Sequence, residues 1–246
     1  MKGFFLVAAI LLMSVSFLKS GVSSDEELRI ITEITQPAAM VLDNGELGGF
    51  GVDIVEAIKK EIGCNAVIEV MPWARGYKYL KENPNIMLFP TTRTFEREKL
   101  FHWVGPIAQH DWVFYGHVDK KHNIKTLDDA KKVSGIGVYR DDVRAHFLES
   151  KGFTNLEVVN DQRTNFRKLE RNRIDLVVVS SIGIEDYLKK NQHLKGIFVP
   201  VFTFRRVELY LAFSQKTNLE IVHQWDKAFR RLKNKGVIKR IQQKWM

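Results

Sequence analysis

Asp175-Leu-Val-Val-Val179 is an apolar run without polar alternation, and this stretch decides the fold class. Such a run predicts a strand that is covered on both faces, as in a parallel sheet with helices on each side. It belongs to a series of alternating elements: strands at 135–139, 156–159 and 176–179, and helices at 142–150, 165–171 and 185–191. Short strands that alternate with amphipathic helices predict an α/β unit.

A second alternating series lies earlier in the chain. Hydrophobic periodicity predicts these elements: strands at 28–35, 66–71 and 86–89, and helices at 50–62 and 73–82. Two β-rich stretches, 111–118 and 199–213, lie between and after the two series, and one long amphipathic helix ends the chain. We therefore expect two α/β lobes joined by paired strands. Ligands of such sheets bind beyond the carboxyl ends of the strands, here in a cleft between the lobes.

Composition and charge are those of a globular chain. Of 246 residues, 45% are hydrophobic and 27% charged, which is sufficient for two cores. The formal charge of +9 first suggests nucleic acid, an anionic membrane surface or an acidic ligand. Basic stretches such as 230–235 alternate with core positions of amphipathic helices, which indicates solvated faces. We therefore expect no nucleic acid partner. The single cysteine, Cys64, leaves no intramolecular disulfide.

The first 24 residues are typical of a secretory signal peptide. Lys2 precedes an apolar segment at 4–15, and small residues follow before the acidic residues at 25–27. The alternative is a membrane anchor, but the segment is shorter than the roughly 20 residues that a spanning helix needs. We expect export to the periplasm, with removal of Lys2 and Lys19 lowering the charge to +7.

Four stretches that follow predicted strands are candidates for ligand contact. They are 45–53, 71–75, 90–97 with its continuation at 101–106, and 137–142. The glycine-rich first stretch contains neither GxGxxG nor GxxxxGK[ST], so the sequence does not predict a nucleotide site.

Taken together, these stretches resemble the family 3 periplasmic solute-binding proteins, the polar-amino-acid type that serve ABC importers. The resemblance extends from Leu28 to Trp245. It rests on motifs in the family's order: Asp43-Asn-Gly45, Gly49-Phe50-x-x-Asp53, Trp73, Thr94-x-x-Arg97, Trp103-x-Gly105-Pro106, Gly137-Val138 and Arg173-Ile174-Asp175.

The resemblance implies a type II two-lobed fold with hinge bending. Lobe 1 would comprise 25–112 plus 206–246 and lobe 2 would comprise 113–205, each with a mixed, mostly parallel sheet flanked by helices and with a two-strand hinge between them. It also implies a monomer without metal or cofactor. Such a protein captures a small anionic or zwitterionic solute and delivers it to an ABC transporter permease or presents it to a membrane receptor.

In this family the Arg of the T-x-x-R motif holds the ligand carboxylate, and the resemblance assigns that role to Arg97. A guanidinium suits it, because its planar fork donates two charge-assisted hydrogen bonds to a carboxylate. The alternative is a solvated Arg in the charged run 93–99. Thr92 matches a hydroxyl that also contacts the carboxylate, or is simply a Thr at a strand end.

Three further residues are expected beside the cleft. Arg93 and Arg75 would favour a ligand with more negative charge, or else form surface or interlobe ion pairs. Trp73 would cover the apolar part of the ligand, or else pack the first turn of its helix.

The sequence departs from the family in two places that contact ligands. The aromatic residue expected in the segment 37–39 is absent, since that segment reads Pro-Ala-Ala, which predicts a roomier pocket. The acid that commonly binds the ligand's α-amino group is replaced by Ser180. A neutral hydroxyl cannot give an ammonium group the charge-assisted bond of a carboxylate.

A third departure is at the start of the second-lobe helix, where Asp141 replaces a glycine and Asp142 follows. These aspartates would cap the helix, or one of them would replace the lost acid. Tyr139 and Arg140 on the same turn are candidates for the second half of the ligand clamp.

The same scaffold could serve two other functions. One is a dehydratase-like enzyme on the same scaffold, but the seven histidines form no HExxH motif and no catalytic residues are predicted. The other is a sensor-associated protein, or a member of the family that has lost binding.

Overall fold

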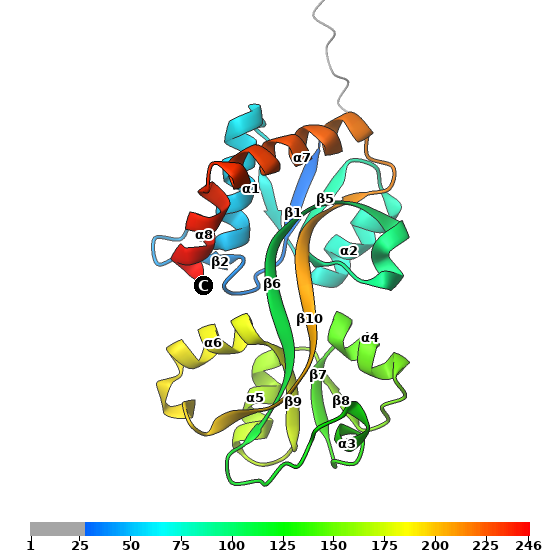
Figure 1. Cartoon of the computed structure of the whole chain (residues 1–246), viewed down its shortest axis with the longest axis vertical. Helices are drawn as coiled ribbons and strands as arrows, with labels where there is room; N and C mark the ends of the chain where they lie inside the picture. Colours follow the sequence, from blue (N-terminus) through cyan, green and yellow to red (C-terminus); the bar gives the residue numbers. More distant parts are fainter. Residues whose placement is uncertain (1–27) are drawn as a thin grey trace, which may run out of the picture.

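Residues 28–246 are described by a computed structural model, so the expected signal peptide at 1–24 lies outside the described residues. The chain forms two lobes, one above the other in Figure 1, and two long strands pass between them. These are β6 (Phe101–His117) and β10 (Phe198–Ser214). They pair antiparallel and form the centre of an eight-stranded sheet of order β4-β1-β5-β10-β6-β9-β7-β8.

The upper lobe contains the N-terminal strands and the C-terminal helices (Figure 1). Three strands are parallel, and β5 pairs antiparallel with β10. The strands are β1 (Arg29–Thr32), β4 (Ile68–Val70) and β5 (Ile86–Thr92), with a small hairpin of β2 (Met40–Val41) and β3 (Leu47–Gly48). The helices are α1 (Phe50–Ile62), α2 (Trp73–Glu82), the 3-10 helix η2 (Phe95–Leu100), α7 (Leu219–Asn234) and α8 (Val237–Trp245).

The lower lobe repeats this plan on the other edge of the long strands. There β9 pairs antiparallel with β6 and parallel with β7, and β7 pairs parallel with β8. The strands are β7 (Ile136–Tyr139), β8 (Leu156–Val159) and β9 (Leu176–Ser180). The helices are α3 (Leu127–Ala130), α4 (Val143–Ser150), α5 (Gln162–Glu170), α6 (Ser181–Lys190) and the 3-10 helix η3 (Gln192–Leu194).

The predicted fold class is confirmed: the fold is α/β, with a mixed, mostly parallel arrangement of strands and helices on the faces. The structure adds elements that were not predicted, namely the β2–β3 hairpin, α3, η2 and η3, and α6 begins at Ser181 instead of 185. Two other differences concern the end of the chain and the long strands. The single terminal helix is two helices, because Gly236 adopts a left-handed conformation (φ 71°) between α7 and α8. The β-rich stretches are longer than expected, since 101–117 pairs with 198–214 along its whole length.

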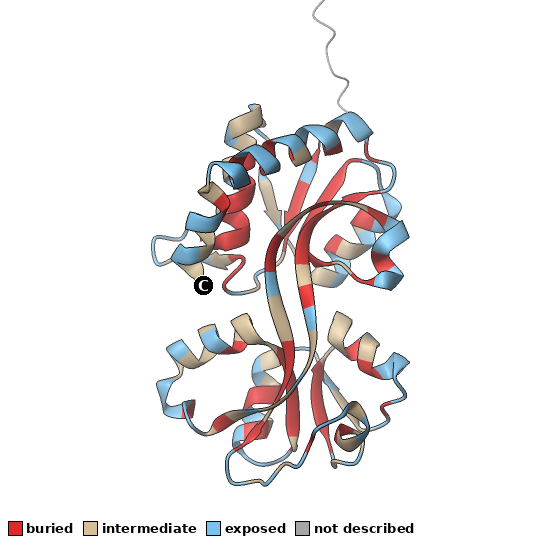
Figure 2. Ribbon diagram, viewed as in Figure 1, coloured by how far each residue is buried: buried red, intermediate tan, exposed pale blue. Residues whose placement is uncertain are grey.

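Hydrophobic burial is largely separate in the two lobes, with Ile182 of α6 packing against the upper core. Figure 2 shows buried residues along the strands of each lobe. The hydrophobic core of the upper lobe extends along the two long strands as far as Ala108 on β6 and Leu209 on β10. The hydrophobic core of the lower lobe begins at Phe114 on β6, and Phe204 on β10 packs against it. The lobe boundaries expected at 112/113 and 205/206 stay predictions. Among residues 28–246, no helix is long and apolar enough to cross a membrane.

Gly49 explains part of the Gly49-Phe50-x-x-Asp53 motif. It precedes α1 with φ 126° and ψ 164°, a conformation that is essentially restricted to glycine. A Cβ atom placed there would lie 2.5 Å from the carbonyl oxygen of Ala38. The glycine therefore lets α1 begin directly against the segment that follows β1, which borders the cleft.

Replacing Gly49 with alanine is expected to lower the free energy of unfolding by about 3 kcal/mol, because backbone strain and steric overlap each cost on the order of 1–3 kcal/mol. The control is Gly63→Ala, where φ is 71° but nothing lies within 4 Å of the added Cβ. That variant should lose only about 1 kcal/mol. Urea denaturation measures both, and equal losses would show that the overlap with Ala38 has no effect.

Candidate ligand-binding site

The cleft between the lobes contains three adjoining cavities. The central cavity, of about 120 Å³, is lined by the ends of β1 and β5 and by η2 from the upper lobe, and by the ends of β7 and β9 from the lower lobe. A cavity of about 430 Å³ adjoins it on the side of α2 and α4, and one of about 380 Å³ adjoins it on the side of α5 and α6. Five of the predicted site residues line the central cavity together with Arg97: Trp73, Thr92, Tyr139, Asp142 and Ser180.

Arg97 is the main positive group of the central cavity. Its side chain is on η2, and the residue is only 6% exposed. The guanidinium donates to the carbonyl oxygen of Thr92 (3.3 Å) and lies over the rings of Trp73 (5.5 Å) and Tyr77 (4.9 Å). Within residues 28–246, no carboxylate forms an ion pair with it. A buried cation is costly unless a charge of opposite sign compensates it, so this arrangement favours an anion in the cavity.

Asp142 faces Arg97 from the lower lobe but is already paired. Its Oδ1 accepts from both the backbone N–H and the Nε of Arg144, each at 2.7 Å, and its Oδ2 accepts from Nη2 at 2.7 Å. Burial acts to raise the pKa of Asp142, but the Arg144 guanidinium and backbone N–H outweigh it and hold that pKa below its usual value. Asp142 therefore caps α4 and is ionised, and most of its charge is neutralised.

Ser180 and Asp141 also serve local structure. The Ser180 hydroxyl accepts from the backbone N–H of Gly183 (3.2 Å) and so caps α6 at the edge of the cavity. Asp141 has φ 57°, a left-handed conformation that Asp tolerates better than most residues. Its side chain is exposed and lines the neighbouring cavity on the α4 side.

Glu33 and His110 are two titratable residues of the cavity that sequence reasoning did not place there. Glu33 follows β1 and accepts from the backbone N–H of Trp73; burial, with a smaller effect of Asp142, raises its pKa to about 7. Burial, followed by the Arg144 charge, lowers the pKa of His110 to about 4. The buried Nδ1 atom of His110 has no hydrogen-bond partner in the described part of the chain. At pH 7 the His110 imidazole is therefore uncharged, whereas Glu33 is near the midpoint of its titration.

Three predicted residues lie away from all three cavities. Arg93 forms a two-pronged ion pair with Glu98, and its guanidinium lies over Tyr210 (5.0 Å). Arg75 donates to the hydroxyl of Tyr79 (3.2 Å).

Arg140 donates from Nε to Oδ1 of Asn160 (2.6 Å), the residue that follows β8. The structure therefore brings one of the four predicted arginines, Arg97, to the cavity. It adds Arg144, which sequence reasoning missed because Val143 and Arg144 read only as the start of an amphipathic helix.

With this fold and this cleft, the chain belongs to the bacterial extracellular solute-binding proteins, family 3, whose profile it matches over residues 28–246. The family resemblance predicted from the sequence is confirmed.

Individual relatives are distant. The L-cystine-binding protein TcyJ of Escherichia coli (strain K12) is 24% identical over 208 residues, which cover 82% of this chain and 76% of TcyJ. The arginine-binding extracellular protein ArtP of Bacillus subtilis (strain 168) is 25% identical over 203 residues, covering 80% and 77%. Among solved structures, a histidine kinase sensor domain with similarity to periplasmic binding proteins has a TM-score of 0.79 and 18% identity, covering 90% of this chain and 97% of that domain.

The shifted pKa values of Glu33 and His110 predict opposite effects of pH on stability. Folding raises the pKa of the Glu33 carboxyl group from 4.5 to about 7. Glu33 therefore stabilises the folded state below pH 4.5, and this contribution is lost as the pH rises through 7. Folding lowers the pKa of the His110 imidazole from 6.5 to about 4. His110 therefore destabilises the folded state as the pH falls from 6.5 through 4. Each effect is at most about 3 kcal/mol.

Urea denaturation of Glu33→Gln and His110→Gln between pH 4 and 8 tests these signs. Relative to the unsubstituted protein, Glu33→Gln should become more stable as the pH rises. His110→Gln should become more stable as the pH falls. Curves of free energy of unfolding that stay parallel for all three proteins would contradict both pKa shifts.

Proposed function

We propose that this protein binds a small zwitterionic solute, an amino acid or a related carboxylate-bearing compound, in the cleft between its lobes. The observation that carries the proposal is the buried guanidinium of Arg97, which lines the central cavity without an acidic partner in residues 28–246. A ligand carboxylate would supply the missing charge and accept two hydrogen bonds from the fork. The hydroxyl of Thr92, on the same wall, would donate a third.

Glu33 is the best candidate partner for an ammonium group of the ligand. Ser180 is neutral and caps α6, and Asp142 is held by Arg144. Glu33 is then the remaining carboxyl of the central cavity. A ligand cation beside it would favour its ionised form, so binding at neutral pH would release a proton from Glu33.

Closure of the lobes would complete the site. Arg97, Thr92 and Trp73 come from the upper lobe, whereas Tyr139 and Ser180 come from the lower lobe. A ligand that contacts both sets binds the closed form more tightly and shifts the equilibrium toward it. Export by the N-terminal signal peptide, a monomeric state and delivery to the permease of an ABC importer complete the proposal. The names of TcyJ and ArtP support amino acids as the ligand class.

Arg97→Ala should weaken binding of the amino acid ligand about 30-fold or more, because removing one partner of a buried charged contact costs roughly 2–5 kcal/mol. Arg97→Lys should bind with intermediate affinity, since it keeps the charge and loses the fork. Isothermal titration calorimetry of the common amino acids, after mass spectrometry of any ligand that co-purifies, gives these affinities.

Arg93→Ala is the matched control, because Arg93 is four residues away and pairs with Glu98 outside the cavities. It should leave affinity unchanged. If Arg97→Ala has the same affinity as the unsubstituted protein for every ligand that binds, Arg97 does not hold the carboxylate and the proposed site is wrong.

A further inference from the structure

The cavity of about 430 Å³ beside the central one is accessible to the same ligand. The two cavities share four wall residues: Trp73, Arg97, Trp112 and Val143. A molecule whose carboxylate binds Arg97 can therefore extend to either side of that guanidinium. The larger cavity has more apolar than polar lining, with the rings of Tyr77 and Phe147 on opposite lobes. Its walls suit a ligand segment of several carbon or sulfur atoms.

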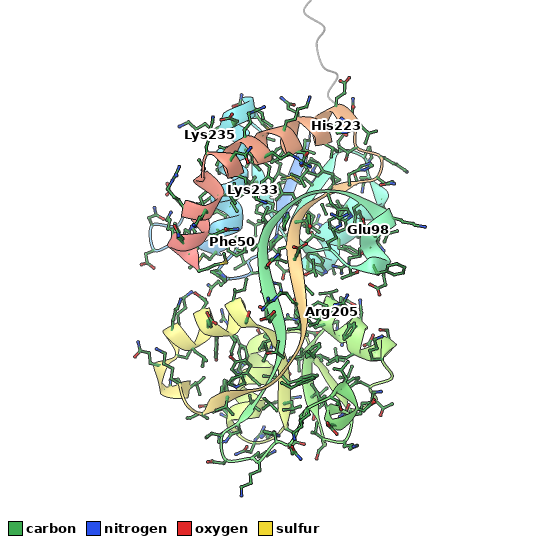
Figure 3. The ribbon with its side chains drawn as sticks, in the orientation of Figure 1. Phe50, Glu98, Arg205, His223, Lys233 and Lys235 are labelled. Atoms are coloured by element: carbon green, nitrogen blue, oxygen red, sulfur yellow. The ribbon has the colours of Figure 1, made fainter. Side chains whose placement is uncertain are left out.

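A second stacked guanidinium, that of Arg205, also lines this cavity and, unlike Arg97, does not line the central one. Figure 3 shows Arg205 on β10 between the lobes, on the side of α4. The guanidinium lies over the rings of Phe147 (4.7 Å) and Trp112 (5.2 Å). In the described part of the chain it takes part in no ion pair and no side-chain hydrogen bond, whereas its neighbour Arg206 pairs with Asp111 (2.8 Å). Stacking occupies the face of the guanidinium and leaves its N–H edge available to an acceptor.

The acids of this cavity lie at its exposed rim. The pKa of Glu96 is lowered by hydrogen bonds from the Thr94 side chain and from the backbone N–H of Glu96 itself. The charges of Arg205 and Arg97 lower it further. Glu96 and Asp141 are both exposed, so water screens their charges. The positive groups, with Lys81 added to the two arginines, outnumber these two acids.

We propose that Arg205 binds a second carboxylate, so that the ligand is an elongated two-headed molecule: a bis-amino acid or dicarboxylate with an apolar spacer. This inference rests on the proposed function, because Arg97 holds the first carboxylate. The spacer would pass between the rings of Trp73 and Tyr77 and that of Phe147. The second carboxylate would accept from the N–H edge of Arg205, which forms no ion pair within residues 28–246 and senses Glu96 only as an exposed, water-screened charge.

The inference is tested with pairs of small molecules in which one member has two amino acid head groups and the other has one. L-Cystine and meso-diaminopimelate have two amino acid heads, whereas S-methyl-L-cysteine and L-norleucine have one. Calorimetry should give about 10-fold or greater tighter binding of each two-headed probe, the gain from one charge-assisted contact. Arg205→Ala should remove this gain and leave the one-headed probes unchanged. Arg97→Ala should weaken binding of both the one-headed and the two-headed probes.

Arg206→Ala is the matched control, since Arg206 is adjacent and exposed and should affect neither kind of probe. Arg205→Gln, which keeps a planar head over Trp112, is the second variant and should also lose the gain. Equal weakening of one-headed and two-headed probes by both Arg205 variants would mean that Arg205 only supports the cleft, and would overturn the inference. Equal affinity of the two kinds of probe for the unsubstituted protein would also overturn it. In both cases a large effect of Arg97→Ala would leave the proposed function standing.

Discussion

The antiparallel pairing of β6 with β10 determines where everything else in this protein lies. The two strands are 17 residues each and pair from Phe101 with Ser214 to His117 with Phe198. The upper lobe adds β5 to the free edge of β10, and the lower lobe adds β9 to the free edge of β6. The carboxyl ends of β1 and β5 therefore meet those of β7 and β9 across one cleft. β10 has register shifts between Pro200 and Phe202, between Thr203 and Arg205 and between Leu209 and Leu211, and such irregularities bend paired strands.

Among the charged groups of the central cavity, Arg97 is the one that the described part of the chain leaves without a counter-ion. Asp142 and Arg144 neutralise each other on the lower lobe, and burial favours the uncharged forms of Glu33 and His110. Arg97 on the upper lobe keeps its charge among aromatic rings. A carboxylate therefore finds one strong partner in the central cavity, which gives a physical basis for solute binding by this member of the family.

The sequence predicted the order of elements well, because apolar runs and helical periodicity report burial directly. The strand at 176–179 and the helix at 50–62 are in the structure within one residue. It predicted the position of side chains near the cleft less well. Arg93 and Arg97 are four residues apart, yet η2 turns Arg97 into the cavity while Arg93 pairs with Glu98. Periodicity does not report such short 3-10 segments.

Glu33 and Arg144 could not be predicted as cavity residues for a related reason. Each lies one or two residues beyond a strand end or helix cap, and its side chain is held by a contact that periodicity does not report: Glu33 by the backbone N–H of Trp73, and Arg144 by Asp142. The acid lost at Ser180 was a visible departure, but that Glu33 lines the same cavity can be seen only in the tertiary fold.

A crystal structure of the protein with the amino acid that binds it tests the central claim most directly. We expect closed lobes, with two carboxylate oxygens of the ligand about 2.7–2.9 Å from the guanidinium nitrogens of Arg97. A ligand bound elsewhere, or a carboxylate held by other residues while Arg97 stays without an anion, would contradict it.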